Sequence, residues 1–146
     1  MIRKLQKVDI NRVADIWLKT NLKAHFFIPE QYWISNYEFV KEMLLQAEVY
    51  VYEDDKMIQG FIGINDEYIE GIFVSDEMQS RGIGKMLLDY IKDKKDRLQL
   101  KVYQKNVRAM SFYQREGFTI QSESMDEFTR EKEYVMNYIL HHQTNT

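Results

Sequence analysis

Two glycines, Gly82 and Gly84, follow an apolar run that ends at Val74 and open a segment with helical periodicity that reaches about Lys94. The first amides of a helix have no intrahelical partner, and together with the helix dipole they favour a bound diphosphate. Glycine lets phosphate oxygens come close to the backbone. The stretch therefore predicts an anion-binding turn made of Gln79, Ser80, Arg81, Gly82, Ile83, Gly84 and Lys85, with Arg81 and Lys85 adding positive charge at its edge.

Other glycine loops fit this stretch poorly. A dinucleotide-binding turn needs a third glycine where Leu87 stands, and a P-loop needs glycine at Gln79 and Ser or Thr at Met86. A tight strand-to-helix turn without any ligand explains two glycines as well as an anion site does. The surrounding sequence must decide between these two interpretations.

The composition limits the chemistry that the chain can perform. Its 146 residues include no cysteine, which excludes thiol nucleophiles, disulfides and thiolate metal sites. The formal net charge of −3 provides no general attraction for nucleic acid. Two of the three histidines, His141 and His142, lie in a polar C-terminal stretch, and with His25 they make a histidine metal site unexpected.

The length and the N-terminal sequence favour one cytoplasmic domain. A chain of this size can bury a core as a single unit, and we assign residues 1–146 to one domain. Charged residues follow Met1 in place of an apolar signal sequence, and no apolar run approaches the roughly 18 residues of a membrane span. We therefore expect no association with a membrane.

Hydrophobic periodicity predicts an α+β domain with the order β-α-α-β-β-β-α-β-α-β-β. Alternation favours a first strand over Met1–Gln6, followed by a helix that Asp9 caps and that ends near Leu22. The aromatic segment Lys23–Tyr37, which holds the only proline, should lead to a second helix around Met43. The other expected elements are strands at Glu48–Glu53, Met57–Asn65, Tyr68–Val74, Leu98–Tyr103, Phe118–Glu123 and Tyr134–Leu140, and helices at Gly82–Lys94 and Val107–Arg115.

Two segments resemble, in this order, the signature of the GNAT superfamily of N-acetyltransferases. The first is QSRGIG after Ile72-Phe73-Val74, which is similar to the family's Gln/Arg-x-x-Gly-x-Gly/Ala turn. The second runs from Asn106 to Phe118 and is similar to N-x-x-A-x-x-F-Y-x-x-x-G-F. The stretch His25-Phe26-Phe27-Ile28 resembles one shared by small bacterial members, whose acceptors include protein lysines, protein N-termini and small amines.

The resemblance implies a largely antiparallel, twisted sheet of about seven strands with about four helices and a central βαβ acetyl-CoA-binding element. It also implies that the strand before the turn splays from its neighbour through a bulge. The backbones of Phe73 and Val74 would then contact the pantetheine arm, and Asn106 would hydrogen-bond the same arm. An unpaired backbone group in such a gap needs an outside partner.

Tyr113 is the general acid that the resemblance implies, with its hydroxyl directed at the thioester sulfur. A tyrosine has an ordinary pKa of about 10 and a thiol one of about 8.5, so full proton donation is uphill. The site must therefore perturb these values, or the phenol must act as a hydrogen-bond donor to developing charge. A core aromatic beside Phe112 is the alternative interpretation.

Residues for the acceptor amine are less marked. Glu70 is a candidate general base and Tyr68 projects on the same face of the strand, although Glu70 also fits a solvated strand position. The segment before the second helix should form a wall of the acceptor cleft, and each of its candidates also fits packing between helices: His25, Phe27, Trp33 and Tyr37. A hydrogen bond with a structural role is as compatible with His25 as titration near neutrality.

The sequence thus predicts a bacterial, acetyl-CoA-dependent N-acetyltransferase that transfers the acetyl group directly to a primary amine, without metal. A CoA-binding sensor or interaction module without turnover is the first alternative, and binding of another nucleotide at the Gly82 turn is the second. Acidic residues such as Asp66, Glu67 and Asp126 favour a cationic acceptor, and a solvated charged face explains them as well. A monomer and a homodimer are both compatible with an exposed sheet edge.

Overall fold

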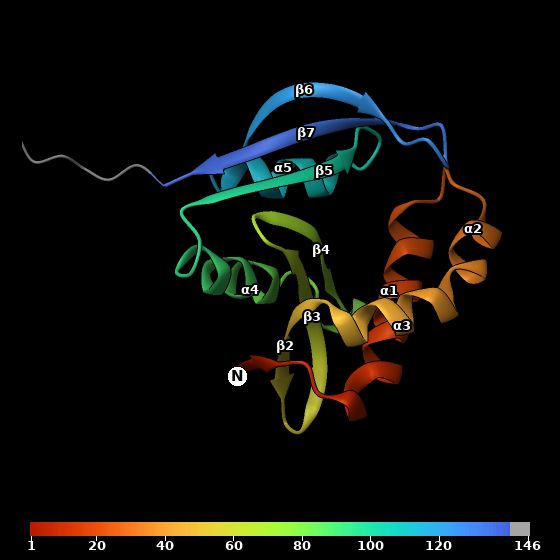
Figure 1. Ribbon diagram of the computed structural model, residues 1–146, viewed down its shortest axis with the longest axis vertical. Helices are drawn as coiled ribbons and strands as arrows, with labels where there is room; N and C mark the ends of the chain where they lie inside the picture. The colour runs from red at the N-terminus through yellow and green to blue at the C-terminus, as the bar shows by residue number, and fades with distance from the viewer. Residues whose placement is uncertain (141–146) are drawn as a thin grey trace, which may run out of the picture.

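The computed structural model describes residues 1–140, and its centre is a twisted seven-stranded sheet in the order β1-β2-β3-β4-β5-β7-β6 (Figure 1). All neighbouring strands are antiparallel except β4 and β5, which run parallel. This confirms the mixed, largely antiparallel sheet predicted from the sequence; His141 and His142 lie outside the described residues. The strands are β1 (Ile2–Lys4), β2 (Glu48–Asp54), β3 (Met57–Asn65), β4 (Tyr68–Val74), β5 (Arg97–Tyr103), β6 (Thr119–Met125) and β7 (Lys132–Ile139).

Helices cover both faces of the sheet. On one face α1 and α3 pack on β2 and β3 through a cluster that includes Val13, Leu44 and Phe61. On the other face α4 and α5 pack through a larger cluster that includes Leu87 and Tyr113. The helices are α1 (Ile10–Ala24), α2 (Glu30–Ser35), α3 (Tyr37–Gln46), α4 (Ile83–Lys92) and α5 (Val107–Arg115), with short 3₁₀ turns η1 (Lys7–Asp9) and η2 (Asp76–Met78).

The helix α4 is anchored by four buried side chains at helical spacing: Ile83, Leu87, Leu88 and Ile91. Burying a side chain of this size contributes about 1.5–3 kcal/mol. The helix begins after Gly82, whose φ of 80° lies in the left-handed region. Its N-terminus is therefore held at a fixed place beside the end of β4.

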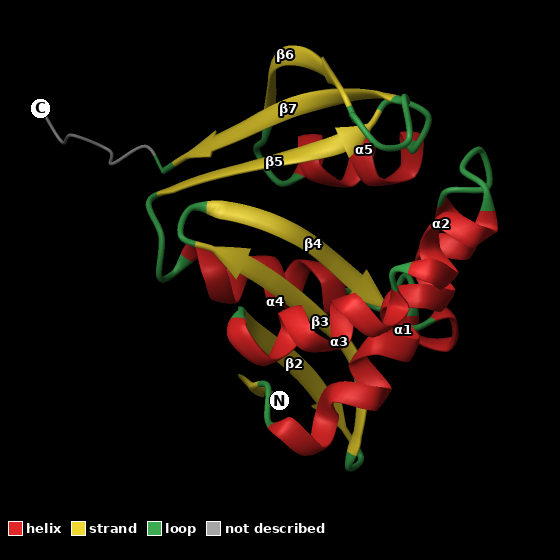
Figure 2. Ribbon diagram, turned by 45° about the vertical axis from the view of Figure 1, so that its right-hand side comes forward, coloured by secondary structure: helices red, strands yellow, loops and turns green. Residues whose placement is uncertain are grey.

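Strands β4 and β5 meet only at their beginnings. Tyr68 pairs with Gln99, and the Gln99 N–H donates to the Glu67 carbonyl at 2.9 Å. Beyond this point the two strands diverge toward α1 and α5 (Figure 2). A bulge in β4 accompanies the divergence, because Ile69 pairs with Ile64 and Gly71 with Gly63, which leaves Glu70 without a partner in β3.

Two local expectations differ from the structure. Asp9 does not cap α1: its carboxylate accepts hydrogen bonds from Arg3 at 2.7 Å and from the Gln6 N–H at 2.8 Å. The segment after α1 contains an additional helix, α2, which starts directly after Pro29. Proline fixes a backbone angle that suits a helix start, and this is the signal in the sequence that marks α2.

Candidate active site

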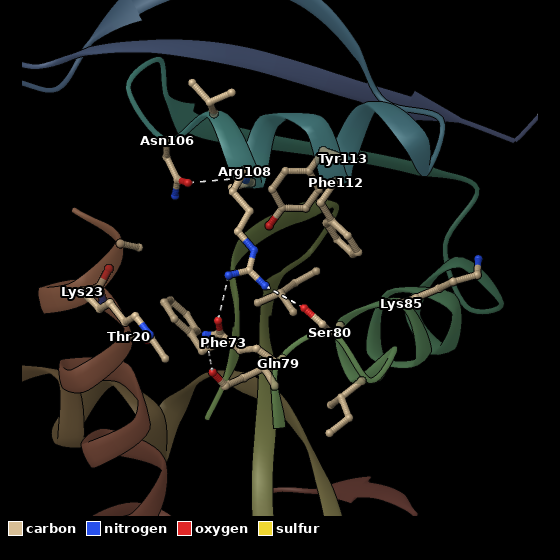
Figure 3. A pocket seen from close by; sticks show the side chains of 18 of the residues that line it. Thr20, Lys23, Phe73, Gln79, Ser80, Lys85, Asn106, Arg108, Phe112 and Tyr113 are labelled. Atoms are coloured by element: carbon tan, nitrogen blue, oxygen red, sulfur yellow. Dashed lines mark hydrogen bonds between the residues drawn. The ribbon is translucent and has the colours of Figure 1, made fainter. Parts of the chain in front are cut away.

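A cavity of about 890 Å³ lies in the gap between β4 and α5 and extends to the start of α4 (Figure 3). This size is within the range of sites that hold small molecules. Its walls come from the end of α1, the end of β4, the turn before α4, and α5, and they include Asn21, His25, Ile72, Phe73, Val74, Gln79, Ser80, Gly82, Ile83, Gly84, Lys85, Asn106, Arg108, Phe112 and Tyr113. The glycine turn and the N-x-x-A-x-x-F-Y segment therefore face the same cavity.

The start of α4 presents free amides to this cavity. No side chain caps the helix, and the first intrahelical bond runs from the Met86 N–H to the Gly82 carbonyl at 3.0 Å. The N–H groups of Ile83, Gly84 and Lys85 therefore have no partner within the helix. Ser80, whose φ of 67° is also positive, lines the cavity beside these amides.

Gly84 leaves space that the fold itself does not require. A Cβ at this position would lie 3.6 Å from the Phe112 ring and 3.9 Å from Ile72, which are ordinary contact distances. Its backbone is helical, without a positive φ. The protein alone would accept alanine here, and the absence of a side chain leaves this backbone open to the cavity.

Arg108 spans the cavity from α5 to the turn (Figure 3). Its guanidinium donates to Gln79 Oε1 and to Ser80 Oγ, both at 3.1 Å. Among residues 1–140 it has no carboxylate partner within ion-pair distance, so a full positive charge rests on two neutral acceptors. No local pattern in the sequence marks Arg108, because only the folded chain brings α5 over the turn.

The other two basic residues of the turn lie differently. The Lys85 ammonium pairs with Glu116 at 3.0 Å and Asp89 at 3.4 Å, and in Figure 3 it points away from the cavity. Arg81 is exposed and does not line the cavity. Arg108 thus supplies the cation at the turn that the sequence analysis expected from Arg81 and Lys85.

The backbone of β4 offers unpaired groups along the gap. The Ser75 N–H donates to the Gln59 carbonyl of β3 at 2.8 Å, and peptide groups alternate in direction along a strand. The peptide groups of Phe73 therefore face β3, while those of Val74 and Ile72 face the gap. The Val74 carbonyl accepts from Gln79 Nε2 at 3.1 Å on that side.

Tyr113 is buried by its own helix and by the rings of Phe112 and Phe118, with 8% of its surface exposed. Its hydroxyl points into the cavity in Figure 3, and it takes part in none of the side-chain hydrogen bonds of residues 1–140. Burial, and to a lesser extent the nearby Tyr68, raises the pKa of Tyr113 well above its ordinary value. The phenol therefore stays protonated at neutral pH and can donate one hydrogen bond into the cavity.

Asn106 caps α5 and contacts His25. Its Oδ1 accepts from the Ala109 N–H at 3.2 Å, and its Nδ2 lies 3.0 Å from His25 Nε2. His25 ends α1, and its Nδ1 lies 3.0 Å from Asn21 Oδ1. Burial lowers the pKa of His25 to about 4, so the imidazole is neutral at neutral pH.

The other candidates for acceptor binding lie outside the cavity. Trp33 is buried between Trp17 and His25, and Phe27 contacts the rings of His25 and Tyr103. The Tyr37 hydroxyl donates to Asp15 on α1, a bond that raises the pKa of Tyr37 to about 12. The structure thus places Trp33 and Tyr37 in packing between helices.

Tyr68 and Glu70 lie on β4 at the start of the gap. Burial, followed by the charge of Glu70, raises the pKa of Tyr68 to about 12, and Glu133 and Asp126 add to the increase. These three acidic side chains therefore lie within electrostatic reach of Tyr68. Partial burial raises the pKa of Glu70 itself, although Glu70 as a whole is exposed and does not line the cavity.

Comparison with known proteins agrees with the geometry. Residues 46–120, about half of the chain, match the family described as "Acetyltransferase (GNAT) domain". The peptidyl-lysine N-acetyltransferase YiaC of Escherichia coli K12 is 32% identical over 140 residues, which cover 94% of this chain and 96% of that protein. The chain belongs to the GNAT acetyltransferase family.

Other GNAT proteins share the whole architecture. The peptidyl-lysine N-acetyltransferase YjaB of Salmonella typhimurium is 26% identical over 84% of this chain and 86% of its own. The solution structure of apo YjaB from Escherichia coli has a TM-score of 0.85 at 19% identity and covers 97% of this chain and 98% of its own. The structure of yncA from Salmonella typhimurium with acetyl-CoA has a TM-score of 0.69 at 20% identity and covers 100% and 96%.

Within residues 1–140 no three His, Cys, Asp or Glu side chains are grouped so that they could hold a metal ion. The helices of the same residues are too short or too polar to cross a bilayer.

Proposed function

We propose that this GNAT protein transfers an acetyl group from acetyl-CoA directly to a primary amine, and that the side chain of a peptidyl lysine is the acceptor. The observation that carries the proposal is the cavity that joins the free amides of the α4 turn to the unpartnered hydroxyl of Tyr113. A diphosphate suits the amides, and a departing sulfur suits the hydroxyl. Acetyl-CoA contains both of these groups, a diphosphate and a thioester sulfur.

Acetyl-CoA, when bound, supplies the acetyl group as a thioester. The N–H groups of Ile83, Gly84 and Lys85 would hold its diphosphate, and the guanidinium of Arg108 would add positive charge beside them. The gap-facing peptide groups of Val74 and Ile72 would hold the pantetheine arm. Ile72 takes the role that the sequence analysis gave to Phe73, because the Phe73 peptide groups face β3.

The reaction forms a C–N bond and breaks a C–S bond, so the sulfur leaves with the electron pair of the broken bond. Tyr113 would donate a hydrogen bond to that sulfur. Its raised pKa makes complete proton transfer less favourable than in water, so the phenol acts chiefly by stabilising developing charge. A peptide N–H of Val74 or Ile72 would stabilise the carbonyl oxygen as the amine attacks.

The acceptor side of the gap is acidic and aromatic. Glu70 would receive the proton that the amine loses, directly or through water, since its raised pKa brings it closer to neutrality. Glu133 and Asp126 would attract a cationic side chain toward Tyr68. The names of the relatives YiaC and YjaB, both peptidyl-lysine N-acetyltransferases, support the choice of lysine.

The test uses purified protein, acetyl-CoA and two matched peptides. One peptide has an internal lysine and a blocked N-terminus, and the other has a free N-terminus and no lysine. We expect acetylation of the lysine peptide, measured by mass spectrometry and thiol release. Tyr113→Phe should lower kcat by about 100-fold while the Kd of acetyl-CoA stays within about twofold.

Three results would contradict the proposal. Thermal stabilisation by CoA without acetylation of any amine would identify a CoA-binding module instead of an enzyme. Stabilisation by ATP or NAD but not by acetyl-CoA would exclude the cofactor. An unchanged kcat in Tyr113→Phe would exclude the phenol from the reaction. The predictions of a cytoplasmic location and a bacterial source stay predictions.

A further inference from the structure

A continuous chain of hydrogen bonds connects the last turns of α1 to the first turn of α5 across the mouth of the cavity. Asn21 Nδ2 donates to the Trp17 carbonyl at 2.9 Å, and Asn21 Oδ1 lies 3.0 Å from His25 Nδ1. His25 Nε2 lies 3.0 Å from Asn106 Nδ2, and Asn106 Oδ1 accepts from the Ala109 N–H at 3.2 Å. Four side-chain contacts in series therefore join two helices that are separated by most of the chain.

The two backbone ends of this chain fix the direction of every bond in it. The Trp17 carbonyl can only accept, so the neighbouring group of Asn21 must be its NH₂ and the oxygen of Asn21 faces His25. The Ala109 N–H can only donate, so the oxygen of Asn106 faces Ala109 and its NH₂ faces His25. Nδ1 of His25 must therefore carry the proton, and Nε2 must be the acceptor.

We propose that His25, as the neutral tautomer with its proton on Nδ1, is a positioning residue that orients Asn106 and holds α5 in place for acetyl transfer. Through Nε2 it fixes one N–H of the Asn106 amide, which leaves the second N–H to face the cavity. Asn106 also caps the helix that carries Arg108 and Tyr113. The inference rests on the proposed function for the roles of these three residues.

The surroundings of His25 favour the neutral ring. Trp33 stacks on it with centroids 5.4 Å apart, and Tyr103 meets it edge-on at 4.9 Å. Among residues 1–140 no charged group bonds to the ring. Its aromatic neighbours contact two charged side chains: Lys105 lies over the Phe27 ring, and Asp126 accepts from the Tyr103 hydroxyl. A protonated ring would also place an N–H on Nε2 against the NH₂ of Asn106, so two donors would face each other.

Nitrogen-15 NMR of the full chain without ligand tests the tautomer directly. We expect His25 to show a protonated Nδ1 and an unprotonated Nε2 at neutral pH, which is the reverse of the tautomer that dominates in free histidine. The spectrum of His25→Asn identifies the signals, because His141 and His142 remain in that variant. A protonated Nε2 in the wild-type protein would overturn the proposal whether or not acetyl-CoA binds.

Two variants separate positioning from simple packing. His25→Gln keeps an amide atom near the place of Nε2 and can accept from Asn106, whereas His25→Asn keeps one near Nδ1 and cannot reach Asn106. Both lose the aromatic ring and one hydrogen bond, so their Tm values should fall by similar amounts. We expect kcat/KM for acetyl-CoA to fall about fivefold to tenfold further in His25→Asn than in His25→Gln, as for one lost hydrogen bond.

Equal kcat/KM in the two variants would overturn the positioning role, even if both are less stable than the wild type. A wild-type protein that binds no acetyl-CoA yet shows the protonated Nδ1 would overturn the proposed function and leave the His25 contact in place. The two proposals can thus fail independently.

Discussion

Burial raises the pKa of both groups that are assigned to move or share a proton, and the consequences differ for the two. A higher pKa makes Tyr113 a weaker acid, so the contribution that we propose for it is a hydrogen bond from a phenol that stays protonated at neutral pH. A higher pKa makes Glu70 a stronger base, provided that the pH is high enough to ionise it. Burial thus limits Tyr113 to hydrogen bonding and strengthens Glu70 as a base.

Glu70→Gln should lower kcat/KM for the lysine peptide by about 100-fold at pH 7, because the amine loses its proton acceptor. The wild-type rate should fall as the pH drops through the raised pKa of Glu70, since the protonated acid cannot accept a proton. The variant should lack this acidic limb in its pH–rate profile. Glu123→Gln, on exposed β6, is the matched control and should keep the wild-type profile. If the pH–rate profile of Glu70→Gln kept the acidic limb, a group other than Glu70 would be the base.

Sequence alone identified single residues where a local motif marks them. Gly82, Gly84, Asn106 and Tyr113 belong to short patterns, and the structure brings all four to one cavity. Arg108 and the pairing of His25 with Asn106 depend on how α5 lies against the rest of the chain, and 81 residues separate the two paired side chains. No spacing rule within one element contains that information.

At the level of elements, the two glycines at the start of α4 differ in what the fold requires of them. Gly82 is needed by the chain, because its φ of 80° strains any residue with a side chain. Gly84 has ordinary helical geometry and room for a methyl group against Phe112. The sequence pattern G-x-G shows both glycines as equivalent, and only backbone angles and distances distinguish them.

Gly84→Ala should stabilise the protein without ligand by up to about 1 kcal/mol, because alanine favours a helix over glycine. The same change should weaken acetyl-CoA binding by about tenfold or more, since the new methyl group faces the cavity. Gly82→Ala, the matched control, should instead destabilise the protein by about 1–2 kcal/mol. Thermal unfolding and titration calorimetry measure the two quantities. A less stable Gly84→Ala, or one with wild-type affinity, would contradict a glycine kept for the ligand.

For the molecule as a whole, the sequence predicted the seven strands, because β2 to β4 are continuous β-rich runs, β5 alternates, and α4 has strong helical spacing. It missed α2, which has only six residues and one buried side chain, Trp33. The strand β6 is nearly all exposed, so its pairing with β7 is not visible as a buried pattern. Contacts between segments that are far apart in the sequence determine these features, and local patterns do not show them.

The whole protein should lose stability as the pH falls from about 6.5 to about 4. The folded pKa of His25 is about 4 against 6.5 for the free side chain, so between these values the unfolded chain binds the extra proton. The part of this loss that His25 causes should be on the order of 3 kcal/mol by the lower pH and should not grow further below it. His25→Gln lacks this group and shares every other titrating residue, so its Tm should fall less over the same range. Parallel losses in the two proteins would show that His25 is not buried as a neutral ring.

The divergence of β4 and β5 divides the sheet into two parts, which are paired only where Tyr68 meets Gln99. A pantetheine arm lying between the two strands would form backbone hydrogen bonds that the strands do not form with each other, much as an added strand would. The two parts of the sheet would then be most rigid while acetyl-CoA or CoA is bound, and least rigid after CoA leaves. The bound cofactor would thus complete the sheet of the protein that uses it.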